Sequence, residues 1–428
     1  MGAVSVGGGA TMQRWLGSMA MHSHSRAATV DCAPASTIGA MTQFDVCVRG
    51  AGVVGRTLAL LLAREGLRVG LLAPAGATAP SAGEVSDVRA YALNGASRTL
   101  LESLRAWPGD TEGTDATAVL AMRVHGDAGG VVTFSAAAER VPALAWIVDV
   151  PALEARLAEA VRFQPLIERI DAPQDAALTV ICEGRASSTR AGFGVDYEVT
   201  PYPQRAIATR LRCEQPHRQV ASQWFDDNEV LALLPLGGPD GDTVAAVWSV
   251  AAERAASLLA LPDEAFAERI TQASRQALGR LDLCSARAEW PLQLARAKHW
   301  VGRHAGASWA LAGDAAHTVH PLSGQGLNLG LADAAALARA LGGRADWRGV
   351  GDLRVLRGYE RARKRELIRM SLLTDGLQQL FGADAGPWKT LRNWGMNGFE
   401  RSGPLKHWAA RQAMGSAAER GATRAARR

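Results

Sequence analysis

The sequence predicts an α/β fold, in which a parallel sheet with packed helices is interrupted by a domain on an antiparallel sheet and followed by C-terminal helices. Three observations predict it. Two nearly continuous apolar runs, Phe44–Val48 and Leu67–Leu72, enclose a glycine turn and an amphipathic stretch, which is the pattern of a βαβ unit. Residues 196–250 alternate apolar and polar side chains, as antiparallel strands do. From Leu327 onward, apolar residues recur at helical spacing.

The remaining elements follow in chain order. Residues 1–40 are rich in Gly, Ala, Ser and Met without a period, so we expect a disordered extension, with Met41 as an alternative start. After the βαβ unit, whose helix should end near Gly66, the spacing predicts these helices: Asn94–Leu104, Pro151–Val161, residues 262–279 and Leu327–Leu341. The alternation predicts these strands: Ala121–Val124 paired with Val131–Phe134, Arg205–Leu211, Val230–Leu234, Thr243–Val250 and Trp309–Ala312.

The composition indicates a folded protein and excludes several functional classes. Of 428 residues, 48% are hydrophobic and 21% are charged, a balance that can form the core of two joined domains. The net charge of +5 is too mild for a nucleic-acid binder. The five cysteines form no CxxC or Cys/His spacing, so we expect neither a disulfide framework nor a zinc site, and a reducing cytoplasm fits best. No apolar stretch reaches about 18 residues, so no membrane span is expected.

The segment Gly50-Ala-Gly-Val-Val-Gly55 fits the GxGxxG pattern directly after a strand and at the start of a helix. Gly50 permits the tight turn, Gly52 lets the backbone approach a pyrophosphate, and Gly55 lets the helix pack closely on the strand. The first helical turn, with Val53 and Val54, supplies N–H donors and positive potential. The motif therefore predicts a bound dinucleotide, and a glycine turn without a ligand is the less favoured alternative.

One usual part of such a site is absent. An Asp or Glu about 20 residues after the turn normally accepts the ribose hydroxyls, but Leu72 and Ala73 occupy that position. Glu84 and Asp87 lie downstream, and a loop would have to bring them back. We expect the missing acceptor to weaken binding by about 1.5–3 kcal/mol, which the other contacts of a large cofactor can offset.

A second motif, Leu311–Leu331, has the sequence LAGDAAHTVHPLSGQGLNLGL. It predicts a strand that presents Asp314 at its carboxyl end, a proline-containing loop, and a helix whose first turn exposes backbone N–H groups. A carboxylate there can accept hydrogen bonds from sugar-like hydroxyls, and a helix N-terminus can stabilise negative charge on a ring. His317 and His320 have no third ligand nearby, so loop structuring or hydrogen bonding near the ligand is favoured over metal binding.

The two motifs together resemble the aromatic-ring flavin hydroxylases, and His320–Ala334 (HPLSGQGLNLGLADA) most resembles the subgroup that hydroxylates ubiquinone precursors. Further segments agree with this family: Asp87–Leu93 with Ser97 and Trp107, Trp146–Val150, Leu231–Leu236 and Leu391–Gly395. The resemblance covers about residues 45–415. It implies a Rossmann-like FAD-binding domain of the GR2 type, with an inserted antiparallel-sheet substrate domain and a C-terminal helical region.

The resemblance and the element order together predict a discontinuous domain organisation. We expect the FAD-binding domain at 41–112, 145–195 and 285–345, the substrate domain at 113–144 and 196–284, helices at 346–415 and a basic tail at 416–428. The segment Arg401–Arg428 is interpreted as a solvated tail, with a peripheral membrane contact as the alternative.

In this family FAD lies extended between the two motifs. The residues that the resemblance implies in cofactor binding are Gly50, Gly52, Val53, Val54, Gly55, Arg89, Gly313, Asp314, Pro321, Gly324, Gln325, Gly326, Leu327 and Asn328. Asp314 is implied to accept hydroxyls of the ribityl chain, and the backbone from Gly324 to Asn328 to stabilise charge at the N1–C2=O edge of the reduced ring. Arg89 and Pro321 are candidates for contact with flavin or substrate, and the sequence identifies no catalytic base.

The resemblance also implies a mechanism. NAD(P)H would reduce FAD by hydride transfer, O2 would add to the ring as a C4a-hydroperoxide, and the distal oxygen would pass to an electron-rich carbon of a polyprenyl phenol. Other ubiquinone-biosynthesis proteins are implied partners, in the cytoplasm or at the periphery of the inner membrane, and no nucleic acid or metal is expected.

One departure from the family keeps alternatives open. Where the family carries a middle Asp-Gly motif, this chain has Glu183-Gly184, which leaves the docking of the pyridine nucleotide open. With Ala73, this departure motivates one alternative function, a flavin-binding, non-catalytic scaffold of a ubiquinone-biosynthesis complex. A second alternative is an NAD-dependent dehydrogenase without flavin, against which the segment Gly313–His317 (GDAAH) argues.

Overall fold

The computed structural model describes residues 43–73, 88–108, 115–126, 129–238, 241–319 and 325–382, with side chains as far as Arg369. Residues from Thr42 onward form one compact unit. Several predictions lie outside the described residues: those for residues 1–40 and 416–428, the start at Met41, and those for Glu84, Asp87, His320, Pro321, Gly324 and Leu391–Gly395. The domain boundaries given above stay a prediction.

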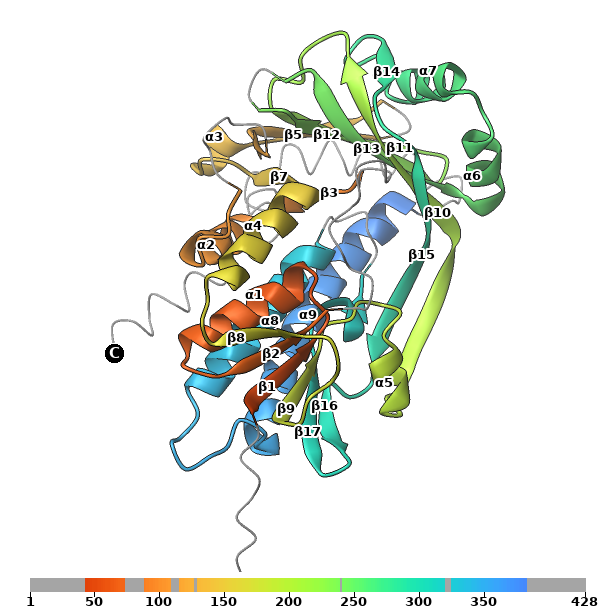
Figure 1. Ribbon diagram of the computed structural model, residues 1–428. Coiled ribbons are helices and arrows are strands. Elements are labelled where there is room, and N and C mark those ends of the chain that lie inside the picture. Colours follow the sequence, from red (N-terminus) through yellow and green to blue (C-terminus); the bar gives the residue numbers. More distant parts are fainter. Residues whose placement is uncertain are drawn as a thin grey trace, which may run out of the picture. The chain divides into compact units, whose positions relative to one another are not determined.

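The first sheet contains six strands (Figure 1). Its order is β16 (Val301–His304), β17 (Ala307–Leu311), β9 (Ala176–Ile181), β1 (Phe44–Arg49), β2 (Val69–Leu72) and β8 (Ile167–Ile170). All neighbours pair in parallel except β16, which lies antiparallel to β17 at one edge. Helix α1 (Val53–Arg64) connects β1 to β2, and Gly66 follows its end with a φ of +79°. The predicted βαβ unit and the strand near Trp309 are therefore confirmed.

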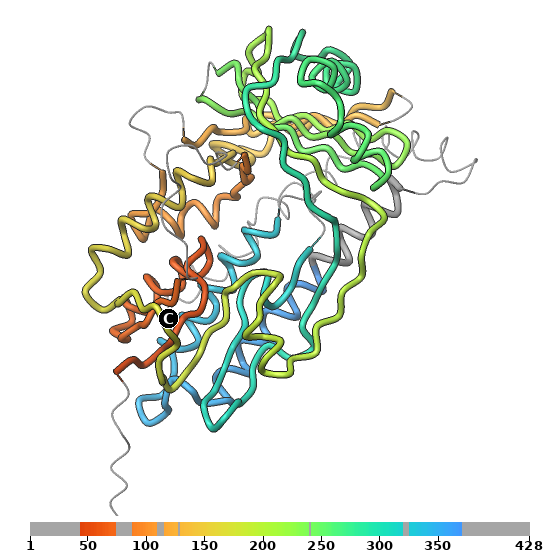
Figure 2. Tube along the Cα trace, turned by 45° about the vertical axis from the view of Figure 1, so that its right-hand side comes forward, coloured from red at the N-terminus to blue at the C-terminus, as the bar shows by residue number. Residues whose placement is uncertain are grey.

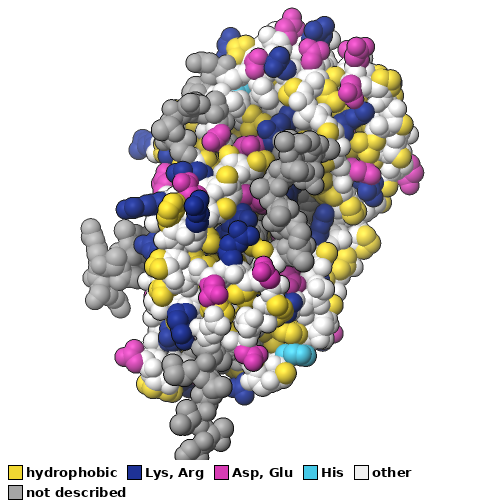
Figure 3. All heavy atoms as spheres, viewed as in Figure 1, with side chains coloured by type: hydrophobic (Ala, Val, Ile, Leu, Met, Phe, Trp, Pro, Cys, Tyr) yellow, Lys and Arg dark blue, Asp and Glu magenta, His cyan; other side chains and the backbone are white. Residues whose placement is uncertain are grey.

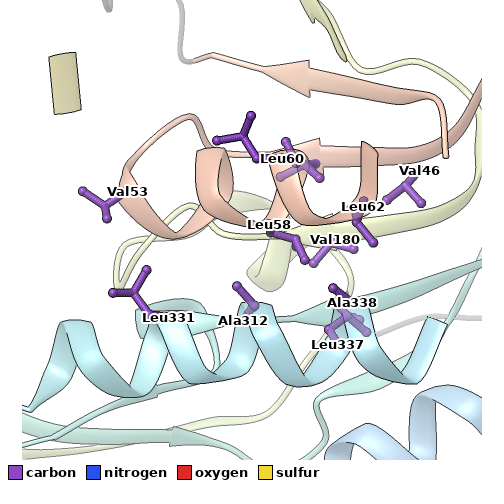
Figure 4. Close-up of a cluster of buried hydrophobic side chains, with 14 of the residues drawn as sticks. Val46, Val53, Leu58, Leu60, Leu62, Val180, Ala312, Leu331, Leu337 and Ala338 are labelled. Atoms are coloured by element: carbon purple, nitrogen blue, oxygen red, sulfur yellow. The ribbon is translucent and has the colours of Figure 1, made fainter. Parts of the chain in front are cut away.

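Helices α1 and α8 (Gly326–Gly342) pack on each other over the first sheet. Figure 4 shows Leu58 and Leu62 of α1 directed toward Val180 of β9, with Leu331 and Leu337 of α8 on the opposite side of this cluster. All five side chains are fully buried, and each leucine contributes about 1.5–3 kcal/mol through burial. Three further helices join this layer: α2 (Gly95–Ser103), α4 (Val150–Arg162) and α9 (Leu353–Gly382). The predicted helices at 94–104, 151–161 and 327–341 are confirmed.

The second sheet has nine strands. Its path is β18 (His317–Thr318), β15 (Ala288–Ala297), β10 (Tyr197–Cys213), β13 (Thr243–Ala251), β12 (Glu229–Leu236), β11 (Val220–Asp226), β5 (Ala121–His125) and β6 (Val131–Ser135), with β14 (Leu281–Leu283) beside β10. The pairs are antiparallel except for β5 with β11, so the predicted strands and the hairpin near Ala121 are confirmed. Figure 2 shows the long β10 (green) and β15 (teal) side by side. Helices α6 (Ala252–Leu259) and α7 (Asp263–Ala273) cover one face.

Two features differ from the sequence-based expectation. The helix predicted over 262–279 ends at Ala273, because Arg275, Gln276 and Gly279 adopt positive φ angles and turn the chain into β14. The third sheet was not expected: it contains only short strands, β3 (Ala90–Leu93), β7 (Ala145–Asp149) and β4 (Ala116–Val119). Short helical segments complete the fold: α3 (Ala136–Glu139), α5 (Ser188–Gly192) and the 3-10 turn η1 (Gly313–Ala315).

The described surface carries charges of both signs. Figure 3 shows acidic and basic side chains interspersed over much of one face, in keeping with the mild net charge. Within the described ranges, no helix has both the length and the apolar character that crossing a membrane requires.

Candidate functional site

The turn after β1 requires glycine at two positions for different reasons. Gly50 has a φ of +110°, and a Cβ there would lie 2.5 Å from the carbonyl oxygen of Cys182. A Cβ on Gly55 would lie 1.8 Å from the carbonyl oxygen of Gly50, which confirms that this position holds the helix close to the turn. A larger side chain at Gly50 would strain the turn and overlap the backbone after β9, and one at Gly55 would push α1 away from the turn.

Gly52, by contrast, faces open space. It is exposed, and a Cβ built on it meets no atom within 4 Å. The first backbone hydrogen bond of α1 runs from Arg56 N–H to the Gly52 carbonyl (3.0 Å), so the N–H groups of Val53, Val54 and Gly55 have no partner along the helix. The helix has no side-chain N-cap and no acid in its first turn. This uncapped N-terminus beside an open glycine suits an anionic group such as a pyrophosphate.

The two glycine-bearing segments meet at Val54. A Cβ on Gly330 of α8 would lie 2.7 Å from Val54 Cγ2, and a Cβ on Gly313 would lie 3.3 Å from the same atom. Gly313 directly precedes Asp314 and itself has a φ of +65°. The first motif and the second motif are therefore in van der Waals contact, as one ligand spanning both of them requires.

Asp314 lies at the end of β17, in η1, with its side chain exposed. Its carboxylate makes no hydrogen bond to any described residue, while its carbonyl accepts one from the Tyr197 hydroxyl (3.1 Å). Although the carboxylate reaches the surface, desolvation by the surrounding protein raises its pKa, and the nearby His317 and Arg185 only partly offset this. The structure thus presents an acceptor that is not used within the described part of the chain, as a hydroxyl-binding role needs.

A buried arginine supports the backbone that carries Asp314. Arg190 donates hydrogen bonds to the carbonyls of Ala315 (3.1 Å) and Arg185 (2.8 Å). Its guanidinium lies 3.5 Å from the centre of the Tyr197 ring, and Tyr197 in turn bonds the Asp314 carbonyl. The turn is therefore held from the side of β10 as well as from the first sheet.

Beneath this turn lies a buried ionic network centred on Asp333 of α8. Asp333 Oδ2 accepts hydrogen bonds from Gly313 N–H (3.0 Å) and His317 Nε2 (2.7 Å), and its Oδ1 accepts one from Arg363 Nε (2.6 Å). Arg363 also pairs with Glu366. Burial alone would raise the pKa of Asp333, but His317 and Arg363 lower it below its ordinary value, so the carboxylate is ionised.

His317 belongs to this network, as its sequence-based interpretation as a loop-structuring residue requires. Its ring stacks on Trp300, with centroids 5.0 Å apart, and its Nδ1 has no hydrogen-bond partner among the residues that the structure describes. Among the described residues, no group of three His, Cys, Asp or Glu side chains could hold a metal ion.

The N-terminus of α8 carries the remaining described site residues. Its first backbone hydrogen bond runs from Leu329 N–H to the Gln325 carbonyl (2.9 Å), so the N–H groups of Gly326 and Leu327 precede the hydrogen-bond ladder of the helix. Within the described part of the chain the helix has no side-chain N-cap, and its first turn contains no acid. These donors fit the prediction that this turn stabilises negative charge on a ring.

The Asn328 side chain, however, is buried and bonded within the protein. Its Oδ1 accepts hydrogen bonds from Asn94 N–H (3.0 Å) and Ser97 Oγ (2.7 Å), and its Nδ2 donates to the Ala92 carbonyl (2.8 Å). Asn328 therefore ties α8 to β3 and α2 through its side chain.

Arg89 lies on the exposed side of this region, with its Nη1 3.5 Å from the Tyr91 hydroxyl. Its carbonyl accepts a hydrogen bond from Val150 N–H (3.4 Å), beside the ion pair between Asp149 and Arg210 of β10. Its positive charge also lowers the pKa of Asp314 slightly, against burial. Arg89 thus lies where the second motif approaches the nine-stranded sheet, so it can face either cofactor or substrate.

The departures noted in the sequence have structural counterparts. No acid follows β2 at Leu72 or Ala73, and Arg49, opposite Leu72, forms an ion pair with Glu183 (3.2 Å). Glu183 also accepts hydrogen bonds from Ser187 Oγ (2.6 Å) and from Thr189 Oγ1 (2.6 Å) and N–H (3.2 Å). Its pKa is lowered despite burial, because these hydrogen bonds favour the ionised form. Glu183 thus anchors the start of α5.

Sequence reasoning missed Asp333 and Arg363. Asp333 is the lone acid in an otherwise apolar helix of Gly, Ala and Leu residues with one Asn and one Arg. A buried acid without a partner is costly, so its isolation was the one available signal of a distant cation. Arg363 lies among many arginines of α9, and nothing in its spacing distinguished it.

Comparisons with known proteins agree with this geometry. A family model described as FAD binding domain matches residues 170–370. A ubiquinone hydroxylase, UbiL, of Rhodospirillum rubrum is 31% identical over 395 residues, which cover 87% of this chain and 90% of UbiL. The 3-demethoxyubiquinol 3-hydroxylase of Escherichia coli is 28% identical over 87% of this chain and 98% of its own length.

Solved structures share the fold. PqsL of Pseudomonas aeruginosa, described as a probable FAD-dependent monooxygenase, superposes with a TM-score of 0.62 at 22% identity over 82% of this chain and 99% of its own. The p-nitrophenol 4-monooxygenase PnpA of Pseudomonas putida gives a TM-score of 0.63 at 17% identity over 87% of this chain and 96% of its own.

The identity to UbiL extends over most of both chains. The chain belongs to the family of FAD-dependent aromatic hydroxylases of ubiquinone biosynthesis.

Proposed function

We propose that this chain is a monooxygenase that hydroxylates the aromatic ring of a polyprenylated phenol in ubiquinone biosynthesis, with NAD(P)H and O2 as co-substrates. The observation that carries the proposal is that α1, α8 and the turn before the exposed Asp314 meet at Val54. The names of UbiL and of the Escherichia coli relative supply the substrate class.

The residues at this site fit FAD, which when bound supplies hydride acceptance and oxygen activation. The N–H groups of Val53 to Gly55 would donate to its pyrophosphate, and Gly52 leaves room for that approach. Asp314 would accept hydrogen bonds from hydroxyls of the ribityl chain. The N–H groups of Gly326 and Leu327 would stabilise negative charge at one edge of the ring.

The substrate would lie between the cofactor and the nine-stranded sheet. In β10, Ile207 and Leu211 pack into the core under α6 and α7, so Ala206, Ala208 and Arg210 belong to the opposite face. Arg210 pairs with Asp149 of β7, beside Arg89, which supports this face as the one turned toward the cofactor.

The test combines gene deletion with mass analysis of the quinone pool. We expect the deletion strain to accumulate a quinone precursor that lacks one oxygen atom, and the wild-type gene to restore the product. A D314A gene should restore it poorly. An S308A gene should restore it fully, because Ser308 bonds the Gly351 carbonyl away from the site (2.6 Å).

Two other results would reject parts of the proposal. An unchanged quinone pool would contradict the pathway. Uptake of FAD without incorporation of labelled oxygen from O2 would favour the non-catalytic scaffold.

A peripheral membrane contact is part of the proposal, and α9 supports it. The five exposed side chains Arg354, Arg357, Arg361, Arg365 and Arg369 fall within an arc of about 120° along about 22 Å of helix. None has an ion-pair partner among the described residues. The two acids of this stretch lie outside the arc and pair with other cations: Glu360 with Lys364 and Glu366 with Arg363. Such a row attracts anionic lipid headgroups, each arginine adding about 1 kcal/mol.

Sedimentation with lipid vesicles tests this contact. We expect binding to phosphatidylglycerol-containing vesicles but not to pure phosphatidylcholine, and about 30-fold weaker binding for R357E/R361E. The matched control R123E/R269E makes the same charge change at exposed residues of the sheet domain and should bind as wild type. Equal loss in both variants would mean that net charge, and not this face of α9, is responsible.

A further inference from the structure

Asp333 is a charged side chain at the centre of an apolar helix contact. It is completely buried, and its carboxylate oxygens accept hydrogen bonds from three places in the chain: Gly313, His317 and Arg363. A buried ionic network of this kind often contributes little to stability compared with apolar residues of the same volume. Stability alone therefore does not explain the presence of this network, and the elements that it connects suggest its role.

The network connects the two elements that carry the candidate cofactor contacts. Asp333 accepts a hydrogen bond from the backbone N–H of Gly313, the residue directly before Asp314. The Arg363 guanidinium, held by Asp333, reaches the carbonyl of Leu329 in the first turns of α8 (3.3 Å). The Asp314 turn and the α8 N-terminus are thus both fastened to one buried ion pair.

The surroundings make this ion pair rigid. Arg363 is 2% exposed and also pairs with Glu366, and the His317 ring is stacked on Trp300. Nearby, the buried Tyr359 hydroxyl donates to the Leu311 carbonyl (2.8 Å), three residues before Asp314. Helix α9 therefore reaches the end of β17 through Tyr359 and the start of α8 through Arg363.

We propose that Asp333 and Arg363 are positioning residues for the flavin end of FAD: together they fix the spacing between Asp314 and the N–H groups of Gly326 and Leu327. The proposal rests on the proposed function in one respect, namely that FAD is the ligand. Asp333 and Arg363 would set the distance between the acceptor for the ribityl chain, Asp314, and the N–H donors for the ring at the start of α8. Neither residue touches the cofactor itself.

The first test measures FAD affinity and flavin reduction potential in D333N and R363K. An amide cannot accept from all three donors as the carboxylate does, and a lysine cannot reach both Asp333 and Leu329 through a planar fork. We expect both variants to bind FAD about tenfold more weakly or worse. The bound flavin should be harder to reduce, with a more negative potential, because the N-terminus of α8 would stabilise the reduced ring less.

The second test separates positioning from stability. The double variant D333N/R363Q removes both buried charges, so it should regain much of the unfolding temperature lost in D333N. If the network positions the cofactor, FAD affinity and potential will stay impaired in the double variant. If it serves stability alone, they will recover together with the unfolding temperature, which would overturn the proposal.

Controls make each outcome decisive. S308A removes a buried hydrogen bond of β17 on the side away from the site, so it should lower the unfolding temperature without changing FAD affinity. D333N and R363K binding FAD within about twofold of wild type would also overturn the proposal. Wild-type protein that takes up no FAD would overturn the proposed function as well, which distinguishes the two failures.

Discussion

The Val54 side chain fills the space beside Gly330: a Cβ on that glycine would lie 2.7 Å from Val54 Cγ2. Gly330 lies inside α8, where alanine would normally be the better helix former. The glycine is therefore explained by the approach of α1, which begins at the dinucleotide motif. This contact sets how closely the two halves of the candidate site can meet.

We predict that G330A is less stable than wild type by about 1–3 kcal/mol, since the new methyl overlaps Val54. The double variant G330A/V54A should recover part of this loss, because V54A removes the overlapping methyl groups. G358A is the matched control: Gly358 also lies inside a helix, but its Cβ would meet nothing within 4 Å. It should stabilise by about 0.5–1 kcal/mol. Urea unfolding measures the stability of wild type, G330A, G330A/V54A and G358A. A G330A protein as stable as G358A would contradict the packing argument.

The glycine turn was predictable from sequence because its constraints are local. Gly50, Gly52 and Gly55 act within six residues of chain, and the strand and helix around them have clear apolar patterns. The network of Asp333 and Arg363 was not predictable, because its members come from separate elements that only tertiary packing brings together. A local pattern cannot specify such a partner.

The same reasoning explains the errors in the fold. The helix predicted over 262–279 continues too far because Ala277 and Leu278 keep the apolar spacing, while the positive φ of Gln276 has no sequence signal. The third sheet was missed because β3 and β4 have four residues each, which is too short for a periodic pattern.

Gly52 and Gly55 should respond differently to alanine. In G52A the apoprotein should keep its stability within about 0.5 kcal/mol, because the new Cβ meets no protein atom. FAD affinity should fall about tenfold or more, because that Cβ enters the space through which the pyrophosphate approaches. In G55A the Cβ would meet the Gly50 carbonyl, so stability should fall by about 3 kcal/mol or more. Thermal unfolding and FAD titration distinguish the two, and equal effects would contradict the separate roles.

Asp314 should show opposite effects on stability and on binding. Its pKa is raised in the folded protein, so ionisation at neutral pH opposes folding, and D314N should stabilise the apoprotein. This gain should disappear as the pH falls below about 4, where the unfolded carboxyl is protonated too. FAD affinity should fall about 10- to 150-fold, since a charged acceptor is lost. Unfolding of apoprotein from pH 3 to pH 8, with FAD titration at pH 7, checks both signs.

Asn328 lies in the most distinctive sequence motif, yet its side chain should matter for folding rather than for flavin. N328A leaves Asn94 N–H, Ser97 Oγ and the Ala92 carbonyl without their partner, so the apoprotein should lose about 2–3 kcal/mol of stability. S97A removes one of these groups and should cost about 1 kcal/mol, and the double variant should lose less than the sum, because the two residues share a hydrogen bond. Additive losses, or an N328A apoprotein as stable as wild type, would place the Asn328 side chain in the cofactor site instead.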